Sequence, residues 1–290
     1  MRMDMYRLFK SKMLYVVLGL MALMSAFMVF MMWLSTTPEF AMYVTGQMTQ
    51  QELNDMASSG GFSVGVSSSS LEGLNGTELA DFTRNQTSMW MSAGALGCFV
   101  SVVIALFFVL DFTSGYVKNL PSSRRDRLAY YGEKMVLVVL LTAVFLAFDI
   151  ATFEIARSIA GLTYAHVDSV GDVAAWFGLS VLLVSVYGAL TAVVTWLTQS
   201  KAAGLAVGLV VGSSMAGSLL AMALSSLGAV WEPLARVAEW LPYSSYALLA
   251  QGGEALLASP GDVGHILVTC GVALVACTVV ALGVCSRKDV

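Results

Sequence analysis

Three ionisable side chains lie close together in one of the most apolar parts of the sequence. Asp149, Glu154 and Arg157 fall near the outer end of an apolar stretch. Charges at membrane depth cost free energy, so they usually face the protein interior or pair with one another. Glu154 and Arg157 are three residues apart and can form an ion pair on one helix face. We expect Asp149 to face protein or water rather than lipid. The other two residues form either a structural ion pair or a polar contact on a transport path.

A basic and aromatic segment, DFTSGYVKNLPSSRRDRLAYYGEK, covers residues 111–134. Gly115 can break a helix, and Pro121 followed by two serines is typical of a turn and a new helix start. The sequence then predicts a short basic helix over 124–131 at the membrane surface. Such a segment either fixes the topology or docks a cytoplasmic partner, with aromatic side chains in a groove and basic side chains around it. The residues assigned to docking are Lys118, Arg124, Arg125, Arg127, Tyr130 and Tyr131.

Catalytic motifs are missing from the sequence. There is no P-loop, so this chain is not expected to bind ATP in that way. The two histidines, His166 and His265, are far apart and belong to no HExxH motif. We therefore expect no enzymatic activity, no cofactor and no metal in this chain.

The sulfur-containing residues support the same expectation. Met24, Met28 and Met32 follow a helical spacing that could gather thioethers around Cu(I). Methionine is also an adaptable apolar side chain, and no His or Cys cluster accompanies these three. The cysteines form no CxxC pair and are interpreted as small buried apolar residues: Cys98, Cys270, Cys277 and Cys285.

The elements that position these residues are apolar helices. The 290 residues are 58% hydrophobic and 12% charged, whereas a soluble domain is about 25% charged. A helix needs about 20 mostly apolar residues to cross the bilayer. Such stretches cover 13–34, 89–110, 135–155, 173–198, 202–227 and 263–285. We therefore expect one all-α polytopic membrane domain over residues 1–290, with six transmembrane helices.

Two connecting segments differ from the rest. Residues 35–88 are rich in Ser, Gly, Thr and Asn and form the largest predicted loop. Residues 228–262 are apolar but are interrupted by Pro233 and Pro242 and contain several charges. Because this second segment is too polar and too interrupted to span, we expect short helices that re-enter the membrane from the outer face.

Lys and Arg concentrate on one side of this topology. With the N-terminus inside, the cytoplasmic side has most of the 15 basic residues: Arg2, Arg7, Lys10, Lys12, Lys118, Arg124, Arg125, Arg127, Lys134, Lys201, Arg287 and Lys288. Cytoplasmic loops are enriched in Lys and Arg, so we expect both termini in the cytoplasm and residues 35–88 to be extracellular. The basic clusters sit beside spans, so the expected contact is membrane lipid and not nucleic acid.

Small residues recur every four positions in the fifth predicted span. Gly204, Gly208, Gly212 and Ala216 would line nearly one helix face and let another helix approach closely. The approaching helix belongs either to the same bundle or to a second subunit.

Several of these features together resemble the ABC type-2 permease family. Residues 111–134 contain an acidic-aromatic pair, a glycine, Lys-Asn, a proline, arginines and a final lysine, and are similar to that family's link between its second and third spans. Residues 5–12 are similar to its amphipathic N-terminal elbow helix. The Leu241-Pro242 step resembles its outer re-entrant segment, and the ending CSRKDV resembles its basic tail. Asp111 stands where the family often has Glu, and Tyr116 where Thr is common.

The resemblance implies the permease subunit of a bacterial ABC exporter in the plasma membrane. A separate ATPase subunit would bind ATP and Mg²⁺ and dock against residues 111–134 and the elbow helix, 1–12. The chain would form a dimer with itself or with a similar permease chain. The second and fifth spans would line a path that moves an amphipathic substrate outward by alternating access. Drugs, peptide antibiotics and lipid-like molecules are such substrates.

Two other classes of function share the predicted spans. A non-transporting multispan protein, such as an immunity or signalling protein, would need no ATPase. An intramembrane enzyme would depend on His166 and His265, which the sequence places in separate segments.

Overall fold

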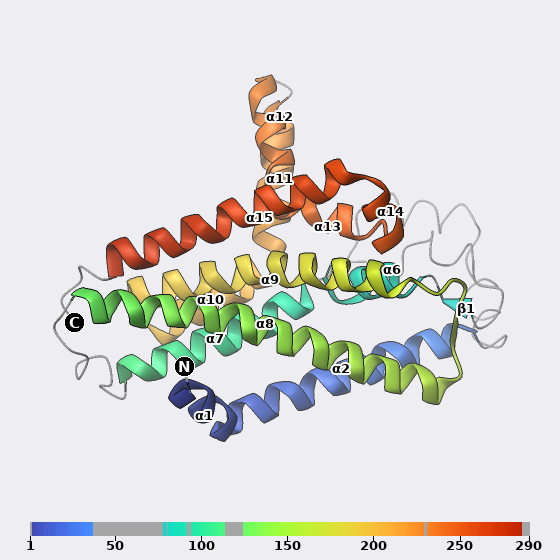
Figure 1. Ribbon diagram of the computed structural model, residues 1–290, viewed down its shortest axis with the longest axis horizontal. Helices are drawn as coiled ribbons and strands as arrows, with labels where there is room; N and C mark the ends of the chain where they lie inside the picture. The colour runs from blue at the N-terminus through green and yellow to red at the C-terminus, as the bar shows by residue number, and fades with distance from the viewer. Residues whose placement is uncertain are drawn as a thin grey trace.

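The computed structural model describes residues 2–36, 78–79, 81–91, 94–113, 124–228 and 231–285 (Figure 1). These residues are almost entirely helical, as the sequence predicts. The elements are α1 (Arg2–Lys10), α2 (Lys12–Thr36), β1 (Glu78–Leu79), α6 (Phe82–Gln86), a π-helical turn η1 (Thr87–Met91), α7 (Ala95–Thr113), α8 (Arg124–Ala160), β2 (Thr163–Tyr164), α9 (Val170–Thr198), α10 (Lys201–Gly212), α11 (Met215–Gly228), α12 (Glu232–Glu239), α13 (Ser244–Leu249), α14 (Gly253–Ala258), α15 (Pro260–Val280) and the π-helical turn η3 (Ala281–Cys285).

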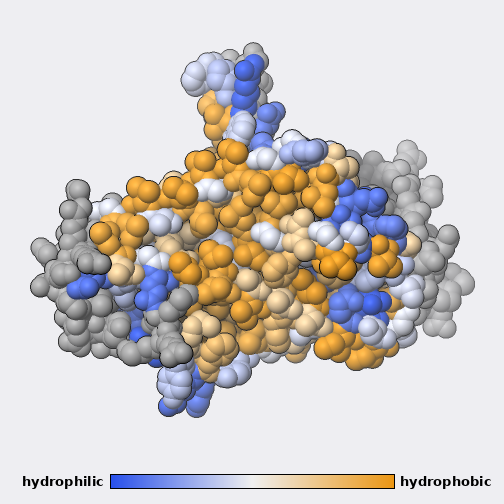
Figure 2. Space-filling model, in the orientation of Figure 1, coloured by the Kyte–Doolittle hydropathy of each residue, from blue (hydrophilic) through white to orange (hydrophobic). Residues whose placement is uncertain are grey.

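Five of these helices are long and apolar enough to cross a membrane: α2, α7, α8, α9 and α15. The pair α10 and α11 passes the same test together, but it is bent by 59° at its break. The residues that the structure describes therefore contain five candidate spans, or six if the bent pair counts as one. Figure 2 shows apolar side chains covering the middle of the visible face, with more polar side chains toward the two ends. This distribution is that of a multi-pass membrane protein.

Helix α8 differs from the prediction at its beginning. A short surface helix over 124–131 and a separate span from 135 were expected, whereas one helix of 37 residues runs from Arg124 to Ala160. The segment contains Gly132 but no proline, and a single glycine costs a helix only about 1 kcal/mol. At 1.5 Å per residue such a helix is about 55 Å long, so it extends well beyond the hydrocarbon layer.

The fifth predicted span is interrupted in the middle. Helix α10 ends at Gly212, Ser214 has a φ of 60°, and α11 leaves at an angle. Ala216 therefore lies beyond the break, and the four-residue repeat does not continue along one helix. In Figure 1, α11 and α12 form a hairpin that projects away from the bundle. Residues 231–258 continue as three short helices, α12, α13 and α14, as expected for the interrupted segment.

The glycine face of α10 is buried inside this chain. Gly204, Gly208 and Gly212 are its buried residues, and α10 packs against α7 and α9. A Cβ placed on Gly212 would lie 2.7 Å from the carbonyl oxygen of Gly97 in α7. The structure thus places the predicted helix-packing face in contact with the same bundle.

This close approach predicts a difference between two glycine-to-alanine changes. Gly212→Ala forces α10 away from α7 and should lower the free energy of unfolding by about 1–3 kcal/mol, as overpacking does. Gly271→Ala in α15 is the matched control, because nothing lies within 4 Å of a Cβ at that position. Thermal unfolding of the purified protein in detergent measures both. Equal stability of the two variants would contradict the proposed contact.

Candidate functional site

A buried polar site surrounds Asp111, near the end of α7. We call it the Asp111 cluster: Arg7, Asp111, Tyr130 and Lys134. Lys134 Nζ lies 2.7 Å from Asp111 Oδ2, and Arg7 Nη1 lies 2.8 Å from Oδ1. The Tyr130 hydroxyl donates a hydrogen bond of 2.8 Å to Oδ2. Asp111 and Lys134 are fully buried, whereas the Arg7 side chain is 29% exposed.

Aromatic rings complete the surroundings of the buried ammonium group. Lys134 Nζ lies 4.8 Å from the centre of the Phe107 ring, 5.4 Å from Phe108 and 5.3 Å from Tyr130. The negative faces of aromatic rings attract a cation at such distances. The ring of Phe108 in turn stacks on Trp196 of α9 at 5.1 Å. The cluster is therefore anchored in the core of the bundle.

The geometry makes the cluster a mechanical link. Arg7 comes from α1, Asp111 from α7, and Tyr130 and Lys134 from α8. A buried ion pair adds little net stability by itself, but removing one partner leaves an uncompensated charge in an apolar environment. The three helices therefore cannot separate at this end without exposing a charge. We call this end of the bundle the basic end.

The predicted docking residues fall into two groups. Tyr130 and Tyr131 are buried in the bundle, where Tyr131 packs edge-on against Trp196 with ring centres 5.1 Å apart. They are thus placed to position α8, and not to fill a groove on a partner. Arg124, Arg125 and Arg127 belong to the first turns of α8. Lys118 lies outside the described residues.

Sequence reasoning did not assemble this cluster. The sequence did contain one signal for it: Asp111 lies near the end of one apolar stretch, and Lys134 lies at the start of the next. The contact of Arg7 with Asp111 could not be predicted from the spacing of the residues, because the two lie far apart in the sequence. Helix α1 itself is present where the elbow helix was expected, and its role as an elbow stays a prediction.

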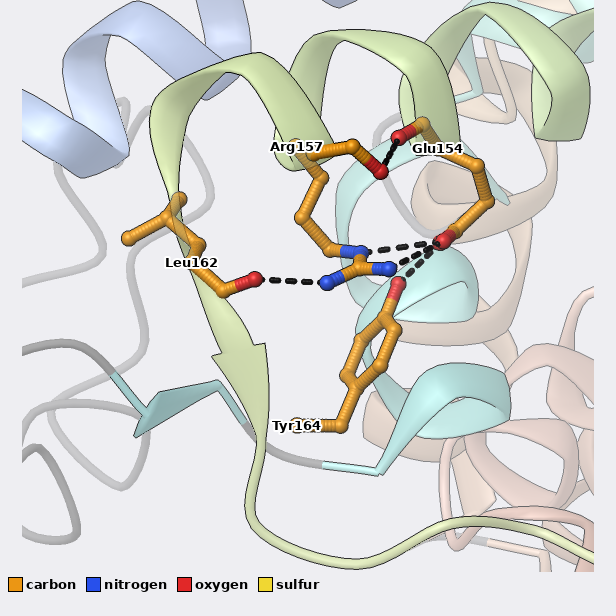
Figure 3. A network of polar contacts seen from close by, with 5 residues as sticks. Glu154, Arg157, Leu162 and Tyr164 are labelled. Carbon is orange, nitrogen blue, oxygen red and sulfur yellow. Dashed lines mark hydrogen bonds and ion pairs between the residues drawn. The ribbon is translucent and has the colours of Figure 1, made fainter.

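A second polar network closes the opposite end of α8 (Figure 3). Arg157 donates from Nε and Nη2 to Glu154 Oε2, at 2.9 and 2.8 Å, and from Nη1 to the carbonyl of Leu162 at 2.5 Å. The hydroxyl of Tyr164 donates to the other oxygen of Glu154. The Arg157 guanidinium also lies 4.5 Å from the centre of the Tyr164 ring. The ion pair expected from the sequence is thus present and holds the chain after α8.

This network connects to the neighbouring elements through Tyr164. Burial is the main cause that raises the pKa of the Tyr164 hydroxyl, and the bond to Glu154 raises it further. The hydroxyl therefore remains a hydrogen-bond donor at physiological pH. Strand β2 pairs in parallel with β1, with Leu79 opposite Tyr164. The Tyr164 ring packs edge-on against Phe82 of α6. These contacts fit the structural interpretation of the pair better than a transport path.

Asp149 lies apart from this network. It is fully buried inside the bundle, as expected, and contacts Ser25 of α2. His166 and Glu254 approach each other at 3.4 Å on the surface. No group of three metal-ligating side chains occurs among the residues that the structure describes.

Comparisons of the chain with protein-family models, curated proteins and solved structures return no match. A functional interpretation must therefore come from the arrangement of the residues themselves.

The Asp111 cluster predicts a large cost for removing one buried charge. Lys134→Met should lower the free energy of unfolding by about 3–5 kcal/mol, because the buried carboxylate of Asp111 loses its closest cation. The double variant Asp111→Asn/Lys134→Met should lose less than the sum of the two single variants. Lys201→Met, at an exposed lysine on α10, is the control and should stay near wild type. Additive losses in denaturant unfolding would show that the pair is not coupled.

For the Glu154–Arg157–Tyr164 network we predict a smaller loss in the free energy of unfolding. Tyr164→Phe removes one hydrogen bond to a charged acceptor and should cost roughly 1.5–3 kcal/mol. Tyr15→Phe removes an equivalent hydroxyl from a tyrosine that is 60% exposed on α2 and should be neutral. Chemical unfolding of both variants in the same detergent measures the difference. A neutral Tyr164→Phe would mean that the hydroxyl does not stabilise this end.

Proposed function

We propose that this chain is the membrane subunit of an ATP-driven exporter that works with a separate ATPase subunit. The observation that carries the proposal is the Asp111 cluster, which ties α1, the end of α7 and the beginning of α8 together. The last residues of α7 and the first turns of α8 belong to the segment, residues 111–134, that the resemblance assigns to ATPase coupling. A soluble motor needs a stiff attachment of this kind to move spans as rigid bodies.

Helix α8 supports the proposal by its continuity. Three of the basic residues assigned to docking, Arg124, Arg125 and Arg127, begin the same helix that crosses the membrane, so no flexible joint separates them from the span. A push or pull on Arg124, Arg125 and Arg127 would pass directly along the helix axis. Because these residues are cationic, the complementary surface of the ATPase subunit would be acidic. The buried Tyr130 and Tyr131 would hold α8 in place while that load is applied.

The remaining parts of the proposal follow from the topology and the resemblance. The basic end would lie in the cytoplasm of a bacterial cell, with both termini, because ATP is available there. The partner subunit would bind ATP and Mg²⁺. Two copies of this chain, or this chain and a similar one, would form the path. Exposed apolar residues of α11, among them Leu219, Leu220 and Met222, suit an amphipathic substrate.

Affinity purification in mild detergent tests the proposal. The wild-type chain should retain an ATP-binding-cassette protein, and the variant Arg124→Glu/Arg125→Glu/Arg127→Glu should lose it through charge repulsion. Arg84→Glu is the control, because this exposed arginine belongs to α6, on the side predicted to be outside. A wild-type chain that confers its cellular phenotype without any ATPase would contradict the exporter and favour a non-transporting membrane protein.

A further inference from the structure

The buried carboxyl group of Asp149 has surroundings unlike those of the other acids in the spans. It points from α8 into the seam with α2, and its side chain is fully buried. Oδ1 lies 3.3 Å from the Ser25 hydroxyl oxygen, and Oδ2 has no hydrogen-bond partner. The neighbouring turns of α8 contribute the buried apolar side chains of Phe145, Leu146 and Phe153.

The hydroxyl groups of this seam give the carboxyl group little compensation. The Ser25 hydroxyl lies 3.0 Å from the carbonyl oxygen of Met21, 3.2 Å from the Thr152 hydroxyl and 3.3 Å from Asp149 Oδ1, to which it can donate. The Thr152 hydroxyl donates to the carbonyl oxygen of Asp149 at 2.9 Å. A hydroxyl has one hydrogen, so Asp149 receives at most one hydrogen bond from Ser25, and Oδ2 has no partner among the described residues. One such contact does not compensate a buried carboxylate.

Among the residues that the structure describes, no cation lies near enough to compensate a negative charge at this position. The helical elements that pack on α8 are α2, α7, α9 and η3, and η3 has no charged residue. Their titratable residues are Lys12 and Tyr15 in α2, Cys98 and Asp111 in α7, Asp172 and Tyr187 in α9, and Cys285 in η3. Lys12 is about 20 Å along its helix from Ser25 at 1.5 Å per residue. On α8 itself, Lys134 is about 22 Å away along the axis and belongs to the Asp111 cluster.

The other cations of α8 are also distant or engaged elsewhere. Arg124, Arg125 and Arg127 lie about 33 Å or more from Asp149 along the helix axis. Arg157 lies two turns beyond Asp149 and forms its ion pair with Glu154. An isolated carboxylate in apolar surroundings is far less stable than the neutral acid. The charge balance and the sparse hydrogen bonding of this carboxyl group among the described residues both favour the protonated acid.

We propose that Asp149 is a proton-binding site in the seam between α2 and α8. The carboxyl group has a proton while the two helices are packed together. When the seam opens and water reaches Oδ1 and Oδ2, the proton leaves as hydronium and the carboxylate remains. Opening of the seam is then coupled to the release of one proton. This coupling depends only on residues of this chain, so it does not require the proposed ATPase partner.

Infrared spectroscopy of the purified protein in detergent tests the protonation state. The wild type at neutral pH should show the carbonyl band of a protonated carboxylic acid, and Asp149→Asn should lose it. Glu154→Gln is the control on the same helix: Glu154 is an ion-paired carboxylate, so the band should persist. Absence of the band from the wild type, or its persistence in Asp149→Asn, would overturn the proposal.

A second variant keeps the test valid if Asp149→Asn does not fold. Ser25→Ala removes the hydrogen bond that the Ser25 hydroxyl donates to Asp149 Oδ1, so the band should shift but remain. An unchanged band would overturn the assigned contact.

The pH dependence of unfolding is an independent readout, because the packed state holds one proton more than the opened state. Between about pH 6 and about pH 8 the equilibrium should shift toward unfolding by up to about tenfold per pH unit in the wild type, and less in Asp149→Asn. Equal pH dependence in both proteins would overturn the coupling.

Discussion

A carboxylate inside an apolar bundle must be compensated, and this requirement shapes the basic end of the protein. Asp111 is compensated by two cations and a tyrosine from two other helices. These partners come from two separate parts of the chain, and the arrangement fixes how α1, α7 and α8 meet. The aromatic rings around Lys134 then connect this polar centre to Trp196 in α9. The positions of four helices are thus linked to the solvation of one acid.

Three acidic side chains in or near the spans are stabilised in three different ways. Asp111 lies between Arg7 and Lys134, whereas Glu154 is held by Arg157 and Tyr164 at the opposite end. In the described part of the chain, the carboxyl group of Asp149 has one hydrogen-bond contact, with the hydroxyl of Ser25. The first two solutions hold helices or strands together because separation would expose charge. The third brings no cation of the described segments to the acid, so its most stable state inside the bundle is the neutral one.

Sequence reasoning could anticipate the local parts of this arrangement. The Glu154–Arg157 pair follows from helical spacing, and most of the spans follow from apolar length. The Asp111 cluster joins residues of three separate helices. The distances between these residues along the sequence do not predict that they meet. Tyr130 and Tyr131 looked like surface aromatics because the surface helix was expected to end before the span. The break at Ser214 was not evident either, since small residues repeat across it as they would in one helix.

Helix α8 is the element common to all three acids. Its first turns hold Tyr130 and Lys134, its middle holds Asp149, and its end holds Glu154 and Arg157. Helix α2 follows α1, which carries Arg7, almost without interruption. A displacement of α1 at the basic end would therefore move the beginning of α2 relative to α8. The seam at Ser25 and Asp149 is where these two helices must slide or part. An acid that is neutral only while the seam is closed would make that motion sensitive to the proton concentration, whatever force drives it.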